Sequence, residues 1–137
     1  MLRNILAFVL GMIAGMAANM AIITLNSSVL FPMPEGIDQR DPEQMNSYLA
    51  TLPAVAFVVV MIAHLAQSFI GGFVAAKVAG SKPMFMAMVV GTFSLAGGVA
   101  AMQMFEGPSW MAVELPLYLV TAWLGCKLAR PTQSQTA

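Results

Sequence analysis

Two ionisable side chains, His64 and Glu114, lie inside long apolar stretches of the chain, where an imidazole and a carboxyl could accept and donate protons. Gln67 and Ser68 follow His64 at three and four residues, so a helix would place an imidazole, an amide and a hydroxyl on one face. Tyr118 follows Glu114 at four residues, again on one helical face. Because an imidazole titrates near neutral pH and burial shifts a carboxyl toward it, the pattern indicates a path for protons or small cations.

Two further polar residues, Asn19 and Gln103, could extend this pair into a column of polar side chains. Counted at about 1.5 Å per residue, Asn19 lies at nearly the same depth as Glu114, which predicts a hydrogen bond between them. Gln103 would lie above them, near the end of the third apolar stretch, with Tyr118 and His64 below. The alternative interpretation is structural: the polar side chains bond only to neighbouring helices, while Glu114 reaches water or stays protonated.

Four apolar stretches must position these side chains, and each approaches the ~20 residues that cross a bilayer as a helix. They cover residues 5–25, 52–78, 83–105 and 110–128. Hydrophobic residues make up 59% of the 137 residues and charged residues 9%, which is more apolar surface than a soluble chain of this length could cover. We therefore predict an all-α integral membrane protein. Residues 1–130 would form a single four-helix antiparallel bundle, followed by a disordered cytoplasmic tail at 131–137.

The placement of charges predicts how the bundle is oriented. All basic residues but Arg40, which lies in the long first connection, flank the ends of the stretches on one side, and these are Arg3, Lys77, Lys82, Lys127 and Arg130. Acidic residues occupy the opposite connections, and these are Glu35, Asp38, Asp41, Glu43 and Glu106. By the positive-inside rule, both termini are expected in the cytoplasm, with the protein in the inner membrane of a bacterium. A cleaved signal peptide is the alternative for the first stretch, but the apolar run is longer than a signal peptide needs.

The only long connection, residues 26–51, is expected outside the cytoplasm. Within it, Asp41-Pro42-Glu43-Gln44 is typical of a helix start, with Asp41 as the N-cap and Pro42 at the first helical position. This pattern predicts a short extracytoplasmic surface helix. Proline lacks a backbone N–H, so Pro53 predicts a bend near Leu52, and Pro116 predicts a kink in the fourth helix.

Small residues recur at helical spacing along the first three stretches, and such stripes let helices approach closely within a membrane. The glycines expected to pack helices together are Gly11, Gly15, Gly71, Gly72, Gly91, Gly97 and Gly98. Packing within the bundle is one interpretation. The other is that a stripe, above all that of the first helix, mediates self-association.

The sequence favours few other functions. It holds no HExxH, G-x-S-x-G or phosphate-binding glycine motif, so we predict no enzyme, and it has no basic face for nucleic acid. Neither a cofactor nor a metal site is expected, because one histidine cannot supply two haem ligands within the chain and the acidic loop lacks calcium-site spacing.

We identify no known family from these motifs. The predicted role is therefore that of a non-catalytic accessory or structural subunit, which packs in the lipid bilayer with itself or a larger membrane complex. The alternative is a homo-oligomeric channel or transporter for protons or small cations that uses Glu114 and His64.

Overall fold

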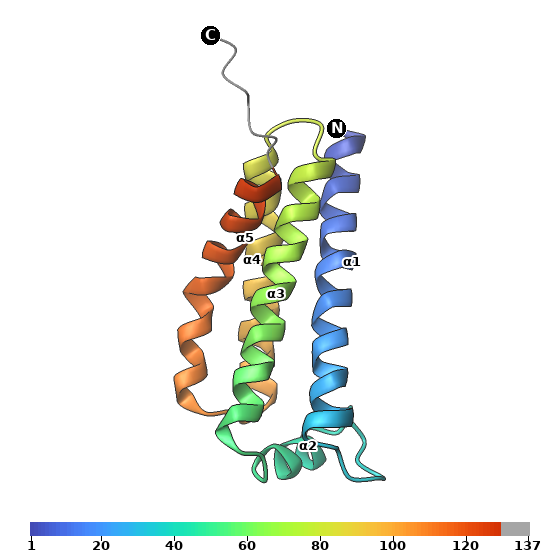
Figure 1. Ribbon diagram of the computed structural model, residues 1–137, viewed down its shortest axis with the longest axis vertical. Coiled ribbons are helices and arrows are strands. Elements are labelled where there is room, and N and C mark those ends of the chain that lie inside the picture. Colours follow the sequence, from blue (N-terminus) through green and yellow to red (C-terminus); the bar gives the residue numbers. More distant parts are fainter. Residues whose placement is uncertain (130–137) are drawn as a thin grey trace.

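The computed structural model describes residues 1–129, whose regular secondary structure is entirely helical, with no strand among them (Figure 1). The predicted tail at 131–137 lies outside the described residues. The α-helices are α1 (Leu2–Leu25), α2 (Pro42–Leu49), α3 (Ala54–Val78), α4 (Pro83–Met104) and α5 (Glu114–Ala129). Two short segments have other helical geometries: Asn26–Leu30 is a π-helical turn and Ser109–Val113 is a 3₁₀ turn.

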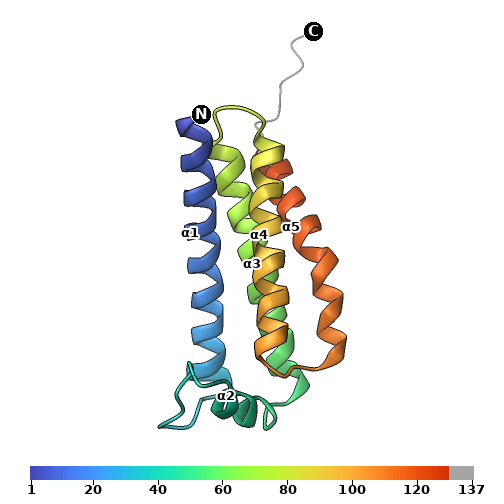
Figure 2. The ribbon, with the colours of Figure 1, turned by 180° about the vertical axis from the view of Figure 1, so that it is seen from behind.

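Four segments are long and apolar enough to cross a membrane, which confirms the prediction of an all-helical chain with four candidate spans. These segments are Leu2–Leu30, Ala54–Val78, Pro83–Met104 and Ser109–Ala129. From the N-terminus the chain runs along α1 to the end where α2 lies and returns along α3, as Figures 1 and 2 show. Helix α4 then leads back toward the α2 end, and α5 returns once more.

The helix ends differ from the prediction at three places. Helix α1 continues through the π turn to Leu30, where a loop was expected from residue 26. Helix α3 begins at Ala54 rather than residue 52, because Pro53 is extended, with ψ 156°. The fourth stretch, predicted as one helix from residue 110, begins as the 3₁₀ turn and becomes α-helical only at Glu114; Pro116 lies in the first turn of α5, where a backbone N–H has no intrahelical partner anyway.

Helix α2 begins as its sequence predicts. The side chain of Asp41 accepts hydrogen bonds from the backbone N–H groups of Glu43, at 3.0 Å, and Gln44. The Gln44 side chain also donates to Asp41, at 2.8 Å. These bonds hold the pKa of Asp41 below its usual value, and the bond from the Gln44 side chain has the largest effect. The cap therefore persists at neutral pH.

Glycines bring the long helices together. A Cβ at Gly11 of α1 would lie 2.8 Å from the carbonyl oxygen of Gly71 on α3, and one at Gly72 would lie 2.8 Å from that of Ala122 on α5. Gly15 likewise lies against the backbone of Gln67. The stripe of α1 is thus covered by α3 within one chain, which favours the interpretation that it packs helices within the bundle.

Two other glycines depart from the prediction. Gly97 is exposed, and a Cβ there would have no heavy atom of the described chain within 4 Å, so it makes no packing contact within the chain. Gly125 of α5 was not predicted, yet a Cβ there would overlap the carbonyl oxygen of Phe69 on α3. Helix α3 therefore packs at backbone distance against both α1 and α5.

Candidate functional site

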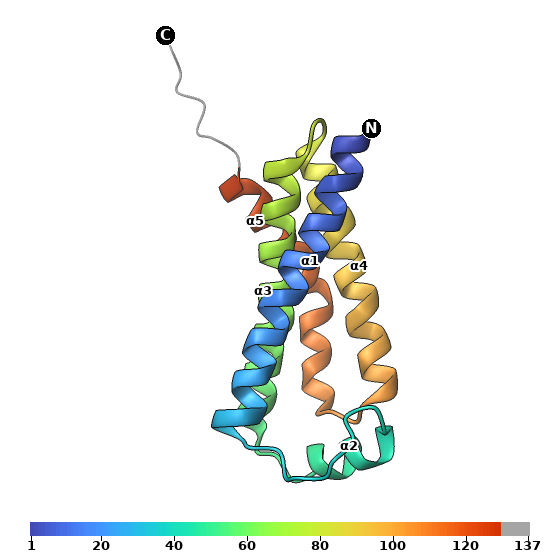
Figure 3. The ribbon, with the colours of Figure 1, turned by 90° about the vertical axis from the view of Figure 1, so that its right-hand side faces the viewer.

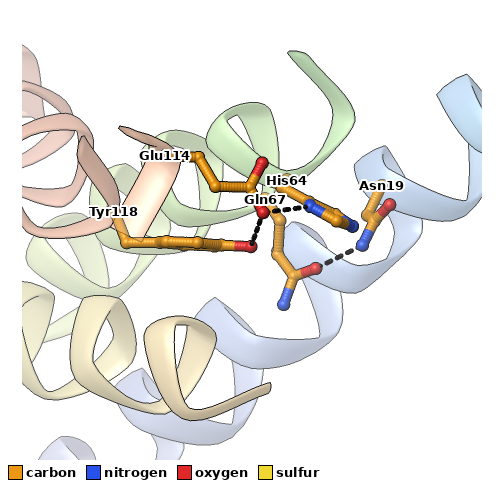
Figure 4. Close-up of polar contacts among 5 residues, drawn as sticks. All are labelled: Asn19, His64, Gln67, Glu114 and Tyr118. Carbon is orange, nitrogen blue, oxygen red and sulfur yellow. Dashed lines mark hydrogen bonds and ion pairs between the residues drawn. The ribbon is translucent and has the colours of Figure 1, made fainter. Parts of the chain in front are cut away.

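His64 of α3 and Glu114 of α5 are directly bonded. The Nδ1 atom of His64 lies 2.9 Å from Oε1 of Glu114 (Figure 4). The Glu114 side chain is fully buried, whereas that of His64 is 17% exposed. One proton lies between these atoms, so either the imidazole donates to a carboxylate or a carboxylic acid donates to the imidazole. The pair can therefore exchange a proton without rearrangement.

Tyr118 lies one turn along α5 from Glu114 and completes this cluster. Its hydroxyl donates to the same oxygen, Oε1, over a long 3.4 Å, and its ring stacks on that of His64 with centroids 6.2 Å apart. Gly98 of α4 makes room for it, since a Cβ there would lie 2.5 Å from the Tyr118 hydroxyl. The hydroxyl of Ser68 donates to the Tyr118 carbonyl at 2.6 Å and fixes α5 against α3. Helices α3, α4 and α5 thus position the aromatic ring together.

The predicted hydrogen bond between Asn19 and Glu114 is not formed. The Asn19 amide donates to Oε1 of Gln67 on α3, at 2.5 Å. The reason is rotational: Asn19 continues the stripe of Gly11 and Gly15, which packs on α3, so Asn19 also faces that helix. Figure 4 shows Asn19 beside His64 on the side away from Tyr118, with the Gln67 side chain between Tyr118 and Asn19.

Gln103 does not belong to the site. It is exposed on α4 and has no hydrogen bond to a described residue. The predicted column therefore lacks its upper member, and the structure brings together five of its six residues in two bonded groups: His64 with Glu114 and Tyr118, and Asn19 with Gln67.

A cavity of about 620 Å³ leads from this cluster to the α2 end of the molecule. It lies between α1 and α4, which diverge toward the α2 end in Figure 3, while the rings of Phe8 and Phe93, 5.0 Å apart, hold them together near the other end. Glu114, His64 and Asn19 line its inner part. Its walls are mostly apolar and include five methionines: Met20, Met33, Met45, Met102 and Met111.

Asn26 also lines the cavity and was not singled out in the sequence. It is buried in the π turn, and its amide donates to the carbonyl of Ala56 at 3.3 Å. The spacing of seven residues from Asn19 would have placed it on the same helical face. The sequence prediction ended the helix one residue earlier, so this signal was missed.

Within residues 1–129 there is no group of three or more histidine, cysteine, aspartate or glutamate side chains that could hold a metal ion. What the site can do is accept and pass protons and bind a positively charged or hydrogen-bond-donating group at Glu114.

Comparisons of the chain with protein-family models, with curated proteins and with solved structures found no match.

Proposed function

We propose that the protein is a membrane transporter in which His64 and Glu114 bind protons or small cations that enter from the extracytoplasmic side. The observation that carries this proposal is the burial of Glu114 at the inner end of a cavity, with His64 bonded to it at 2.9 Å. A buried carboxyl inside a membrane is costly unless it is neutral, paired or hydrated, and such residues are typical of ion and proton pathways.

In this proposal the four long helices form an antiparallel bundle in the inner membrane of a bacterium, with both termini in the cytoplasm. The charges support this orientation. Arg3 donates to the carbonyl of Val78 at 2.9 Å and so lies at the α3–α4 turn, which is flanked by Lys77 and Lys82. At the other end, the backbone N–H of Glu106 donates to Asn46 of α2. The positive-inside rule then places α2 on the extracytoplasmic surface.

The shape of the interior supports transport by alternating access. The cavity reaches the α2 end, where Glu106 and Gln39 lie in its wall. On the cytoplasmic side of the pair, the helices close up: a Cβ at Gly91 would lie 2.6 Å from that of Ala122, and Gly72 meets the same residue. A cation would therefore reach Glu114 from outside and leave only after α5 separates from α3 and α4.

An accessory or structural role within a membrane complex stays a second proposal. One face of α4 favours it, because it is exposed and carries several small side chains, beside Phe93, that would suit a second copy or another membrane protein. The exposed small residues of this face are Thr92, Ala96, Gly97 and Ala100. This role predicts that the purified protein conducts nothing by itself.

Proton flux in liposomes tests the transport proposal. We expect liposomes with the wild-type protein to dissipate an imposed pH gradient faster than empty liposomes. Glu114→Gln and His64→Ala should reduce the rate to that of empty liposomes, because each removes a proton-exchanging group. The rates are read from an entrapped pH-sensitive dye at equal protein incorporation.

Glu35→Gln is the matched control, since Glu35 is exposed outside the cavity and the substitution makes the same change of charge. It should leave the flux unchanged. Wild-type flux equal to that of empty liposomes would overturn transport of protons and favour the accessory role.

A further inference from the structure

The cavity wall holds buried hydrogen-bond acceptors that have no donor. Among the described residues, four buried side-chain atoms lack a hydrogen-bond partner, and three of these belong to residues that line the cavity. These three are Oε2 of Glu114, Oδ1 of Asn19 and Oδ1 of Asn26. All three are oxygens. In Figure 4 the second carboxylate oxygen of Glu114 points away from the Tyr118 hydroxyl.

A buried polar atom without a partner costs free energy, so three such atoms around one space indicate a missing donor. At Asn26 the two side-chain atoms can be told apart by their neighbour. The carbonyl of Ala56 only accepts hydrogen bonds, so the atom that bonds to it is the amide nitrogen, and the atom without a partner is the oxygen. Among the described residues, no lysine or arginine lines the cavity, whereas Glu106 and Glu114 do. The electrostatics therefore favour a cation that carries N–H groups.

The rest of the wall favours an apolar body on that cation. Five methionines line the space, and methionine side chains adapt to irregular apolar ligands. Phe57 and Phe105 add aromatic surface. A volume of about 620 Å³ lies in the range of drug-sized ligand sites and far exceeds that of a bare metal ion. An inorganic cation would leave most of this apolar wall against water.

We infer that the substrate is a lipophilic organic ammonium ion, whose charged nitrogen donates to Glu114 and whose apolar part lies against the methionine wall. Asn26 of the π turn lies seven residues after Asn19 of α1, about 10 Å along the helical axis, and the two offer acceptors between the α2 end and Glu114. This inference rests on the proposed transport function and names its substrate class.

Binding to the full-length protein in lipid nanodiscs tests the inference. The probes are naphthylethylammonium and naphthylethanol, which share an apolar body and differ in charge, and calorimetry with empty nanodiscs gives the background. We expect the wild type to bind the ammonium ion at least about tenfold more tightly than the alcohol. Glu114→Gln should abolish this preference, while Glu35→Gln should keep it.

A second variant, Ala101→Phe, tests the site independently of whether Glu114→Gln folds. Ala101 is half-buried in the wall of the cavity, so a phenyl ring there fills the space and leaves the carboxyl in place. Binding of both probes should be lost while the helix content from circular dichroism stays unchanged. Equal affinities of the wild type for the two probes, or an ammonium preference that survives Glu114→Gln, would overturn the inference.

The two proposals fail differently. Proton flux without ammonium selectivity would overturn this substrate class and leave the proposed function standing. Glu114-dependent ammonium binding without any flux would support the site and overturn transport.

Discussion

Replacing Gly125 by leucine is expected to destabilise the protein by at least about 3 kcal/mol, the upper end of what overpacking a core costs. Gly125 is buried, and even a Cβ there would overlap the carbonyl oxygen of Phe69 and lie 2.9 Å from the backbone nitrogen of Phe73. Backbone atoms cannot turn aside as a side chain does, so α5 must move away from α3. The free energy of unfolding in mixed detergent micelles, followed by circular dichroism, measures the loss.

Gly97→Leu is the matched control, because the same substitution on exposed α4 meets no described atom within 4 Å. Its unfolding free energy should stay within about 0.5 kcal/mol of the wild type. Equal losses in the two variants would show that the close approach of α5 to α3 does not determine stability.

Removing His64 alone is expected to be more harmful than removing it together with Glu114. In His64→Leu, the fully buried Glu114 loses its short bond and keeps only the 3.4 Å contact with Tyr118. A buried group left without its partner costs about 1–3 kcal/mol. The double variant His64→Leu with Glu114→Leu replaces both groups by apolar side chains and should recover much of that loss.

The four unfolding free energies of wild type, two single variants and double variant form a cycle that isolates the coupling between the two side chains. We expect the single losses to sum to more than the double loss by about 1 kcal/mol or more. Strictly additive losses would mean that the two side chains do not stabilise each other.

The sequence was sufficient for the helices because their signals are local. Long apolar runs are visible in composition, and the start of α2 depends on Asp41 and Gln44, which bond within four residues of each other. The π turn at Asn26 was not predicted, because it depends on a contact with Ala56 on another helix. Gly125 was missed for the same reason: nothing along α5 shows that Phe69 will lie against it.

The candidate site was predicted by residue type and only partly by pairing. Counting residues along helices estimates depth, and it placed Asn19, Glu114 and His64 at compatible levels. Depth does not give rotation, however, and the glycine contacts of α1 turn Asn19 toward Gln67. The prediction for Gln103 is wrong for the same reason: its depth suits the column, but it lies on an exposed face of α4. The cavity depends on the divergence of α1 and α4, which no single helix encodes.

The central claim is that His64 and Glu114 share a proton at the inner end of the cavity. Because His64 is the only histidine of the chain, protein labelled with ¹⁵N in histidine alone gives one pair of imidazole resonances. We expect Glu114→Gln to shift both resonances, Nδ1 more than Nε2, since Nδ1 faces the carboxyl, while Glu35→Gln leaves them in place. Identical spectra for wild type and Glu114→Gln in lipid nanodiscs would contradict the account.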